Sequence, residues 1–325
     1  MPVILTWLHQ AILFGAFIML AALGEILTEK SGNLNLGLPG TMCVGAAAGI
    51  IGLDVYSASG GKSAFMIIVI SLSCAFAAAA AMGGLYSFFT VTLRINQNVV
   101  GLVMTVFGVG LAKFLSACFV NIPASGNVRF ERAYTVFSAK VPFISSSLGW
   151  VSYLLFSYGF MFYLTIALAV VLTLFLNKTR HGLALRAVGE NPAAADAVGI
   201  NVIKFKYLST CIGSGITGLA GLFCVMEFKS GAWSTADISS IKAFGWLAVA
   251  LVIFAMWKPL NLIWGSLLFG IFYWAYQYII QIPTDITQML PYIVTIVVLV
   301  IVSLKRRKEN QGPASLGVTY FREDR

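Results

Sequence analysis

Charged side chains are scarce in this sequence. Asp, Glu, Lys and Arg together make up 10% of the 325 residues, whereas hydrophobic residues make up 59%. A soluble domain carries about 25% charged residues. Several apolar stretches reach the roughly 20 residues that are needed to cross a bilayer. The first of them, residues 5–27, has neither a basic leader nor a small-residue cleavage site, so we expect a retained span. The composition excludes an ordinary soluble domain and indicates an integral membrane protein.

Groups that bind metals or act as nucleophiles are also scarce. His9 and His181 are the only histidines, and the five cysteines form no C-x-x-C pair. A zinc site would therefore lack ligands, and neither G-x-S-x-G nor H-E-x-x-H occurs. The "GGKS" at Gly60–Ser63 lacks the glycine that a phosphate-binding loop needs at position 56, where Tyr56 stands. We expect no catalytic residues, no metal and no cofactor.

The net charge of +9 has a simple explanation in a membrane protein. Lys and Arg gather in the cytoplasmic loops of such proteins. Nucleic-acid binding, which a basic soluble chain would suggest, is therefore disfavoured.

The hydropathy pattern predicts an all-α polytopic membrane protein with about nine transmembrane helices. The third stretch is long for one crossing, and Gly83-Gly84 leaves open whether it is one span or two. The expected domains are a transmembrane unit at residues 1–304 and a basic cytoplasmic tail at 305–325. The expected spans are 5–27, 39–57, 63–91, 98–120, 150–177, 205–227, 243–257, 262–281 and 286–304.

The distribution of basic residues predicts the orientation. With the N-terminus outside, fourteen basic residues fall in cytoplasmic segments and six fall outside. The "KRRK" at 305–308, directly after the last expected span, supports this most clearly. We therefore predict an N-out, C-in topology. Two outer loops, 121–149 and 228–243, either contact a soluble partner or are simply solvated connections.

A small, polar segment interrupts the apolar pattern at 187–201, "AVGENPAAADAVGIN". Asn191 can cap a helix that begins at Pro192, and Gly189 and Gly199 supply flexible backbone at its two ends. Four alanines make this helix thin. The cytoplasmic loop at about 178–204 therefore contains either a helix that inserts into a groove on another protein or an ordinary capped surface helix.

Polar residues near the ends of spans are candidates for a solute pathway. Ser31–Gly40 combines two asparagines with several glycines, and two amides stand near the start of the fourth span. These residues line either a pathway or a capped turn. Glu25 and Glu227 are expected at the membrane interface, and Lys113 is expected to reach the outer surface. Small residues in "AFAAAAAMGG" and "GSGITGLAG" predict close helix packing. The pathway candidates are Asn33, Asn35, Gly37, Gly40, Gln97 and Asn98.

Three segments carry a resemblance to a known family. They are "LGEILTEKSGNLNLGLPGTMCVGAAAG", "RAVGENPAAADAVGI" and "FGWLAVALVIFAMWKPLNLIWGSLLFG". The sequence resembles inner-membrane permeases of ABC importers of the ribose, branched-chain amino acid and nucleoside type. The "SGNLNLG" form is most similar to nucleoside permeases that work with basic-membrane-protein-type lipoproteins. Pro39 and Ala255 depart from the family pattern, which often has Glu and Gly there.

The resemblance implies a transport subunit that forms the path for a nucleoside or related solute in the bacterial cell membrane. ATP would be bound and hydrolysed by a partner ATPase. A second permease, giving a heterodimer, and an extracellular substrate-binding lipoprotein are the other expected partners. A ribose-like sugar permease, a self-sufficient secondary transporter and a membrane enzyme are alternatives. The residues that would contact the ATPase are Arg186, Gly189, Glu190, Asn191, Pro192, Ala195 and Gly199.

Overall fold

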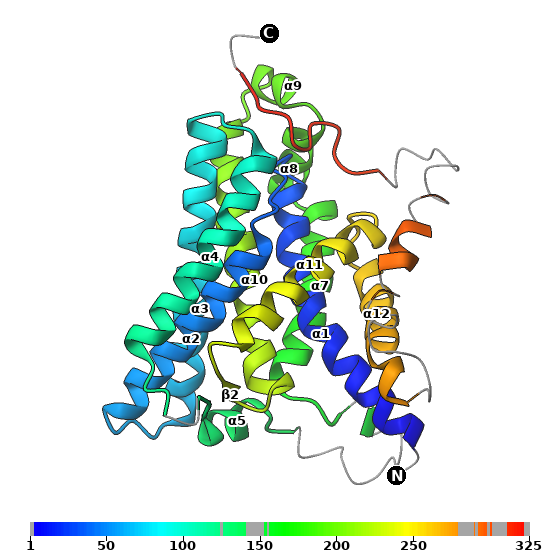
Figure 1. Cartoon of the computed structure of the whole chain (residues 1–325). Helices are drawn as coiled ribbons and strands as arrows, with labels where there is room; N and C mark the ends of the chain where they lie inside the picture. The colour runs from blue at the N-terminus through cyan, green and yellow to red at the C-terminus, as the bar shows by residue number, and fades with distance from the viewer. Residues whose placement is uncertain are drawn as a thin grey trace.

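The structure is a computed structural model that describes residues 3–123, 126–140, 153–154, 156–278, 289, 292–297, 300 and 311–321. Helices run side by side between two ends of an elongated bundle (Figure 1). One end carries the short helix α9 (Pro192–Ala197) and residues 311–321, and we call it the α9 end. The start of the chain lies at the other end, together with strands β1 (Val128–Arg129) and β2 (Ala232–Trp233). We call this the sheet end.

Seven helices in the described part of the chain are long and apolar enough to cross a membrane. The prediction of a polytopic helical membrane protein is therefore confirmed, while the number nine and the orientation stay predictions. A further apolar helix, α12 (Asn261–Tyr278), follows them. The seven are α1 (Val3–Glu29), α2 (Leu38–Ala58), α3 (Ala64–Ser87), α4 (Gln97–Phe119), α7 (Phe160–Lys178), α10 (Val202–Phe223) and α11 (Asp237–Phe254).

The third expected span is one continuous helix. The helix continues through Gly83 without a break. This glycine lies instead at a close helix contact, because a β-carbon there would be 2.7 Å from the carbonyl oxygen of Thr210 on α10. The helix ends instead in a wide turn at Phe88–Thr92, closed by a bond from Leu93 N–H to Phe88 O of 3.0 Å. α10 ends in the same way at Cys224–Phe228.

Several predicted boundaries are wrong. The fifth span was expected from residue 150, but its helix begins at Phe160. The seventh was expected from residue 243, and α11 begins at Asp237, where the carboxylate accepts hydrogen bonds from Ser234 and so fixes the turn before the helix. Local polarity at 237–242 concealed this start. Most of the ninth expected span, 286–304, lies outside the described residues.

α1, α2 and α10 form the centre of the bundle. They approach closely because glycines face each other where they cross: a β-carbon on Gly45 would lie 2.2 Å from Gly218 Cα, and one on Gly24 would lie 2.3 Å from Gly213 O. The small-residue segment at 213–221 therefore packs as predicted. α3, α4 and α7 lie outside this centre and expose many large apolar side chains, including Phe65, Val106 and Val171.

The two long connections at the sheet end pair with each other. β1 and β2 form a two-stranded antiparallel sheet in which Val128 faces Trp233. This short sheet departs from the all-α expectation. Its residue Trp233 is fully buried, and the sheet lies beside helix α5 (Glu131–Phe137). An ion pair between Lys229 and Asp237 closes the second connection. The parts of the two loops that form the sheet are thus structured.

Candidate functional site

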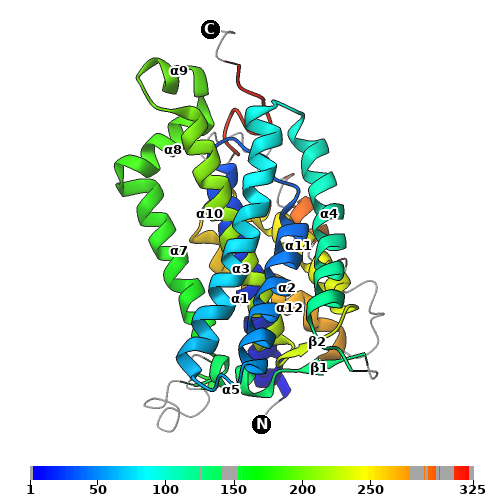
Figure 2. The same ribbon diagram turned by 90° about the vertical axis from the view of Figure 1, so that its left-hand side faces the viewer.

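The segment predicted to contact an ATPase forms two short helices at the α9 end. α8 (Arg180–Glu190) is capped by Thr179, whose hydroxyl accepts a hydrogen bond from the N–H of Gly182 at 3.0 Å. Asn191 then caps α9 by accepting the N–H of Ala194 at 3.0 Å, and Pro192 occupies the first helical position. Gly199 ends the segment with a left-handed φ of +86°. The predicted capping pattern is confirmed, and α9 stands above the ends of the spanning helices (Figure 2).

The predicted contact residues divide into two groups. Gly189 and Ala195 face inward: Ala195 packs with Val188 and Val202, and a β-carbon on Gly189 would lie 2.2 Å from the carbonyl oxygen of Lys30. The other members of the predicted set are exposed or half-buried, and Arg186 donates a hydrogen bond to Asn177. These outer members are Arg186, Glu190, Asn191, Pro192 and Gly199.

An exposed apolar tip completes the outer surface of this element. Val198 is not among the predicted contact residues. It is 76% exposed, and Ala194 and Ala197 beside it are also exposed. Single apolar residues on a surface are ordinary. Here the exposed apolar group stands directly after the last residue of a projecting, capped helix.

Residues 311–321 cross the base of α8 and α9, and we call them the C-terminal strap. Ser315 bonds the carbonyl oxygen of Gly189 twice, from its amide at 3.0 Å and from its hydroxyl at 2.6 Å. The amide of Gly317 donates to Gly32 O at 3.2 Å. Tyr320 donates to the Asp196 carboxylate at 3.0 Å. Residues 311–321, which belong to the predicted basic tail, are thus bonded to the bundle.

The strap also connects to the turn between α3 and α4. Gln97 accepts the N–H of Leu34 at 2.7 Å and donates to Val318 O at 3.3 Å. The Arg94 guanidinium lies 4.9 Å from the centre of the Phe321 ring. One short segment therefore joins the α8–α9 element, the connection before α2 and the α3–α4 turn.

The asparagines of 31–40 make hydrogen bonds within the protein. Asn33 is fully buried and donates to Thr210 Oγ1 at 2.9 Å and to Lys206 O at 3.4 Å. The Asn35 side chain accepts the N–H of Gly37 at 3.0 Å, which shapes the turn into α2. The Oδ1 of Asn33 is buried and accepts no hydrogen bond from the residues that the structure describes. These contacts fit the capped-turn alternative, and a role in the pathway stays a prediction.

The other pathway candidates have different surroundings. Gly40 lies where α2 crosses α4, because a β-carbon there would be 2.5 Å from Met104 O. Gly37 is restricted in the same way, because a β-carbon there would lie 2.7 Å from Asn35 Oδ1. Gln97 is buried in the bonds given above, whereas Asn98 is exposed at the start of α4. The structure thus brings Asn33, Asn35, Gly37, Gly40 and Gln97 together around the connection between α1 and α2, whereas Asn98 is exposed.

The two acids expected at the membrane interface are buried in the bundle. Glu25 is 1% exposed and Glu227 is 6% exposed. Glu29, which the sequence analysis passed over, is 4% exposed and accepts a hydrogen bond from the indole of Trp257. Nearness to the end of an apolar run does not reveal that neighbouring helices cover a side chain, so the sequence did not predict this burial, and the depth of the two acids in the membrane stays a prediction.

Charges also approach each other beside the strap. Lys30, which follows α1, lies close to Arg186 and Glu190. Burial lowers the pKa of the Lys30 ammonium, Arg186 lowers it further, and the Glu190 carboxylate opposes this effect. Within the described residues no three His, Cys, Asp or Glu side chains form a group that could hold a metal ion.

Sequence reasoning missed Ser315, Tyr320 and Val198. The sequence around 311–321 is neither periodic nor strongly polar, so only its spatial contacts distinguish it. Val198 carried a weak signal, as an apolar residue directly before the glycine that ends α9.

Comparison with known proteins identifies relatives over almost the whole chain. The nucleoside ABC transporter permease protein NupC of Lactococcus lactis is 30% identical over 96% of this chain and 95% of its own length. The guanosine ABC transporter permease protein NupQ of Bacillus subtilis is 28% identical over 89% of each chain. The putative glucose ABC transporter permease protein TsgC13 of Haloferax volcanii is 31% identical over 81% of this chain and 74% of its own. No solved structure gives a significant match.

Residues 7–299 match the family described as the permease component of the branched-chain amino acid transport system. This match covers most of the chain and agrees with the helical bundle and with the resemblance found in the three sequence segments. The chain therefore belongs to this permease family and is a multi-pass ABC transport permease.

Proposed function

We propose that this protein is the permease subunit of an ABC importer that carries a nucleoside across the cytoplasmic membrane of a bacterium. The observation that carries the proposal is the capped, projecting α8–α9 element on a chain that aligns with two nucleoside permeases over 96% and 89% of its length. A standalone carrier has no use for such an element, whereas a permease must receive the closing motion of a separate ATPase.

The ATPase binds at the tip of α9 in this proposal. The exposed apolar side chain of Val198 enters a groove on the ATPase, and Glu190, Asn191 and Arg186 form the polar rim. Gly189 and Ala195 act from beneath by fixing α8 and α9 on the bundle. The α9 end is then cytoplasmic and the sheet end outside, which agrees with the predicted N-out, C-in orientation.

Capture of the ATPase tests this contact. Val198→Glu places a charge at the centre of the docking surface, and Ser59→Glu, an exposed change at the sheet end, is the matched control. Tagged protein is purified from native membranes in mild detergent, and partners are identified by mass spectrometry. We expect the wild type and Ser59→Glu to retain an ATPase and Val198→Glu to lose it. Equal recovery with all three proteins would place the contact elsewhere.

A second permease and an extracellular substrate-binding lipoprotein complete the proposed transporter. The pathway candidates Asn33, Asn35, Gly37, Gly40, Gln97 and Asn98 lie in the cytoplasmic part of the chain in this orientation. The side-chain amides of the three asparagines and of Gln97 suit a neutral solute that is recognised by hydrogen bonds rather than by a charged clamp. The Oδ1 of Asn33, which accepts no hydrogen bond within the described part of the chain, is the acceptor that favours this role.

A sugar is the second candidate solute, favoured by the 31% identity to a putative glucose permease. Uptake of radiolabelled guanosine, ribose and glucose into cells that carry the complete transporter, with and without the permease, separates the two. We expect permease-dependent uptake of guanosine alone. Uptake of a sugar would replace the nucleoside assignment, and uptake that continues without any ATPase would favour a secondary carrier.

A further inference from the structure

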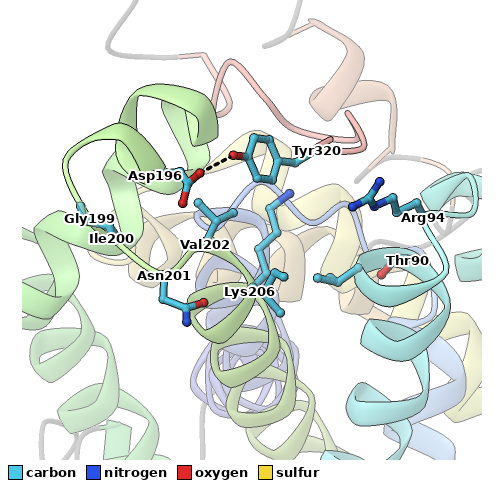
Figure 3. Close-up of a pocket in the computed structure, with 11 residues that line it drawn as sticks. Thr90, Arg94, Asp196, Gly199, Ile200, Asn201, Val202, Lys206 and Tyr320 are labelled. Carbon is cyan, nitrogen blue, oxygen red and sulfur yellow. Dashed lines mark hydrogen bonds between the residues drawn. The ribbon is translucent and has the colours of Figure 1, made fainter. Parts of the chain in front are cut away.

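A polar pocket of about 360 Å³ lies under α9, at the α9 end of the bundle. Its walls come from the end of α3 and the turn after it, from the connection between α9 and α10, and from the strap (Figure 3). Arg94, Lys206, Asp196 and Tyr320 supply its polar side chains. The volume falls within the roughly 300–1,000 Å³ that is typical of small-molecule sites.

Lys206 is the central group of this pocket. It is only 3% exposed, yet its side chain extends from α10 into the space between Tyr320 and Arg94 (Figure 3). Within the part of the chain that the structure describes, its ammonium group has no hydrogen-bond or ion-pair partner. Lysine is almost never so deeply buried unless it is paired. The side chain of Lys206 is therefore packed among its neighbours, while its ammonium group faces the pocket and is available to an anion.

Arg94 adds a second cation on the opposite wall. It has a left-handed φ of 58°, which is uncommon for a residue other than glycine, and its guanidinium group packs over the ring of Phe321. The turn and the strap thus hold the arginine at the pocket. Asp196 is the one acidic side chain among the lining residues, and it accepts a hydrogen bond from the hydroxyl of Tyr320. Lys206 and Arg94 thus bring two cationic side chains to the lining of one pocket.

The first turn of α10 contributes backbone donors. Val202 and Ile203 line the pocket, and the amide groups in the first turn of a helix have no acceptor within that helix. The Asn201 side chain accepts a hydrogen bond from the N–H of Lys204 at 2.9 Å. The amides of Val202 and Ile203 are left for another acceptor. A helix start of this kind favours an anion, and here it stands beside the buried ammonium of Lys206.

We propose that this pocket binds a phosphate group. A phosphate has enough oxygens to accept bonds from the ammonium, the guanidinium and the α10 amides together, and its negative charge compensates Lys206. The group belongs either to a free phosphate or small phosphate ester or to the headgroup of an anionic lipid. Bound phosphate would join the α3–α4 turn to the base of α9 and hold these two elements together.

The test uses the full chain in nanodiscs of phosphatidylcholine, with radiolabelled inorganic phosphate as the probe. Lys206→Met keeps the apolar stem and removes the charge, and Arg94→Gln tests the second cation independently. Lys204→Gln is the matched control, because Lys204 lies two residues away on α10 and is exposed. We expect saturable phosphate binding that Lys206→Met and Arg94→Gln each weaken at least tenfold and Lys204→Gln leaves unchanged.

A second arm identifies a lipid source. The same four proteins are extracted from membranes that contain phosphatidylglycerol, and retained lipid is measured by native mass spectrometry. Retention of phosphatidylglycerol that is lost in Lys206→Met and Arg94→Gln, without binding of free phosphate, assigns the site to a headgroup. Binding in neither arm, or binding that survives both substitutions, overturns the proposal.

The midpoint of thermal unfolding distinguishes a loss of phosphate binding from a simple folding defect. Lys206→Met replaces an uncompensated buried charge with an apolar side chain, so the ligand-free variant is expected to melt at the same temperature as the wild type or higher. Added phosphate should then raise the midpoint of the wild type and of Lys204→Gln but not that of Lys206→Met. None of these measurements involves an ATPase or uptake, so failure here leaves the proposed transport function untouched.

Discussion

At the residue scale, Gly189 shows why a position in a motif need not be a contact. It stands in the segment that resembles a coupling loop, yet its α-carbon lies against the carbonyl oxygen of Lys30, and its own carbonyl accepts two bonds from Ser315. Only glycine leaves room for this approach. The residue therefore fixes the α8–α9 element on the bundle, and the surface that a partner meets belongs to its neighbours.

Gly189→Ala is expected to destabilise this end of the protein. The added β-carbon would lie 2.2 Å from a backbone oxygen, so α8 or the connection after α1 must shift. Gly110→Ala is the matched control, because a β-carbon on Gly110 of α4 has no neighbour within 4 Å. The midpoint of thermal unfolding in detergent should fall by several degrees for Gly189→Ala only, and the ATPase should be lost with it. An unchanged midpoint would contradict this packing.

Asn33 and Asn98 allow the capped-turn alternative to be tested against the pathway. Asn33→Ala removes two buried hydrogen bonds to α10, and the free energy of unfolding should fall by about 1–3 kcal/mol. Asn98→Ala changes an exposed side chain and should stay within about 0.5 kcal/mol. Stability is measured first and the KM of uptake second. A raised KM with unchanged stability in Asn33→Ala would favour direct contact with the solute.

At the scale of elements, the C-terminal strap decides how firmly α8 and α9 are held. α9 has six residues and buries little more than Ala195. Isolated helices of this length are not stable in water. Bonds from Ser315, Gly317 and Tyr320 supply part of the missing support.

Truncation after residue 310 should therefore loosen α9 without unfolding the bundle. Hydrogen–deuterium exchange of the amides at 191–200 is expected to quicken at least tenfold, while exchange in α1, α2 and α10 stays slow. Truncation after residue 321 keeps the strap and is the matched control. If exchange at 191–200 is the same in both truncated proteins, the strap does not support α9.

At the scale of the whole molecule, the two ends of the bundle are built differently. The α9 end carries the α8–α9 element and the strap, whereas the sheet end carries the connections that pair through β1 and β2. The start of α1 and the strap lie at opposite ends, as an odd number of crossings requires.

Cysteine labelling tests the orientation in intact cells. In a background with the exposed Cys118 replaced by serine, Ser59→Cys marks the sheet end and Val198→Cys marks the α9 end. A membrane-impermeant maleimide is expected to react with Ser59→Cys in whole cells and with Val198→Cys only after permeabilisation. Reaction of both in whole cells, or the reverse pattern, would contradict the N-out, C-in topology.

The sequence by itself determined that this protein crosses a membrane many times, because length and apolarity fix which segments can enter a bilayer. It also determined the capped α9, since Asn191, Pro192 and Gly199 act through their own local backbone. Only the tertiary structure decided which way residues face: Ala195 and Gly189 inward, Glu25 and Glu227 into the bundle. The strap, the short sheet and the Lys206 pocket join segments that are far apart in the chain, and contacts of that kind leave no periodic or local pattern to read.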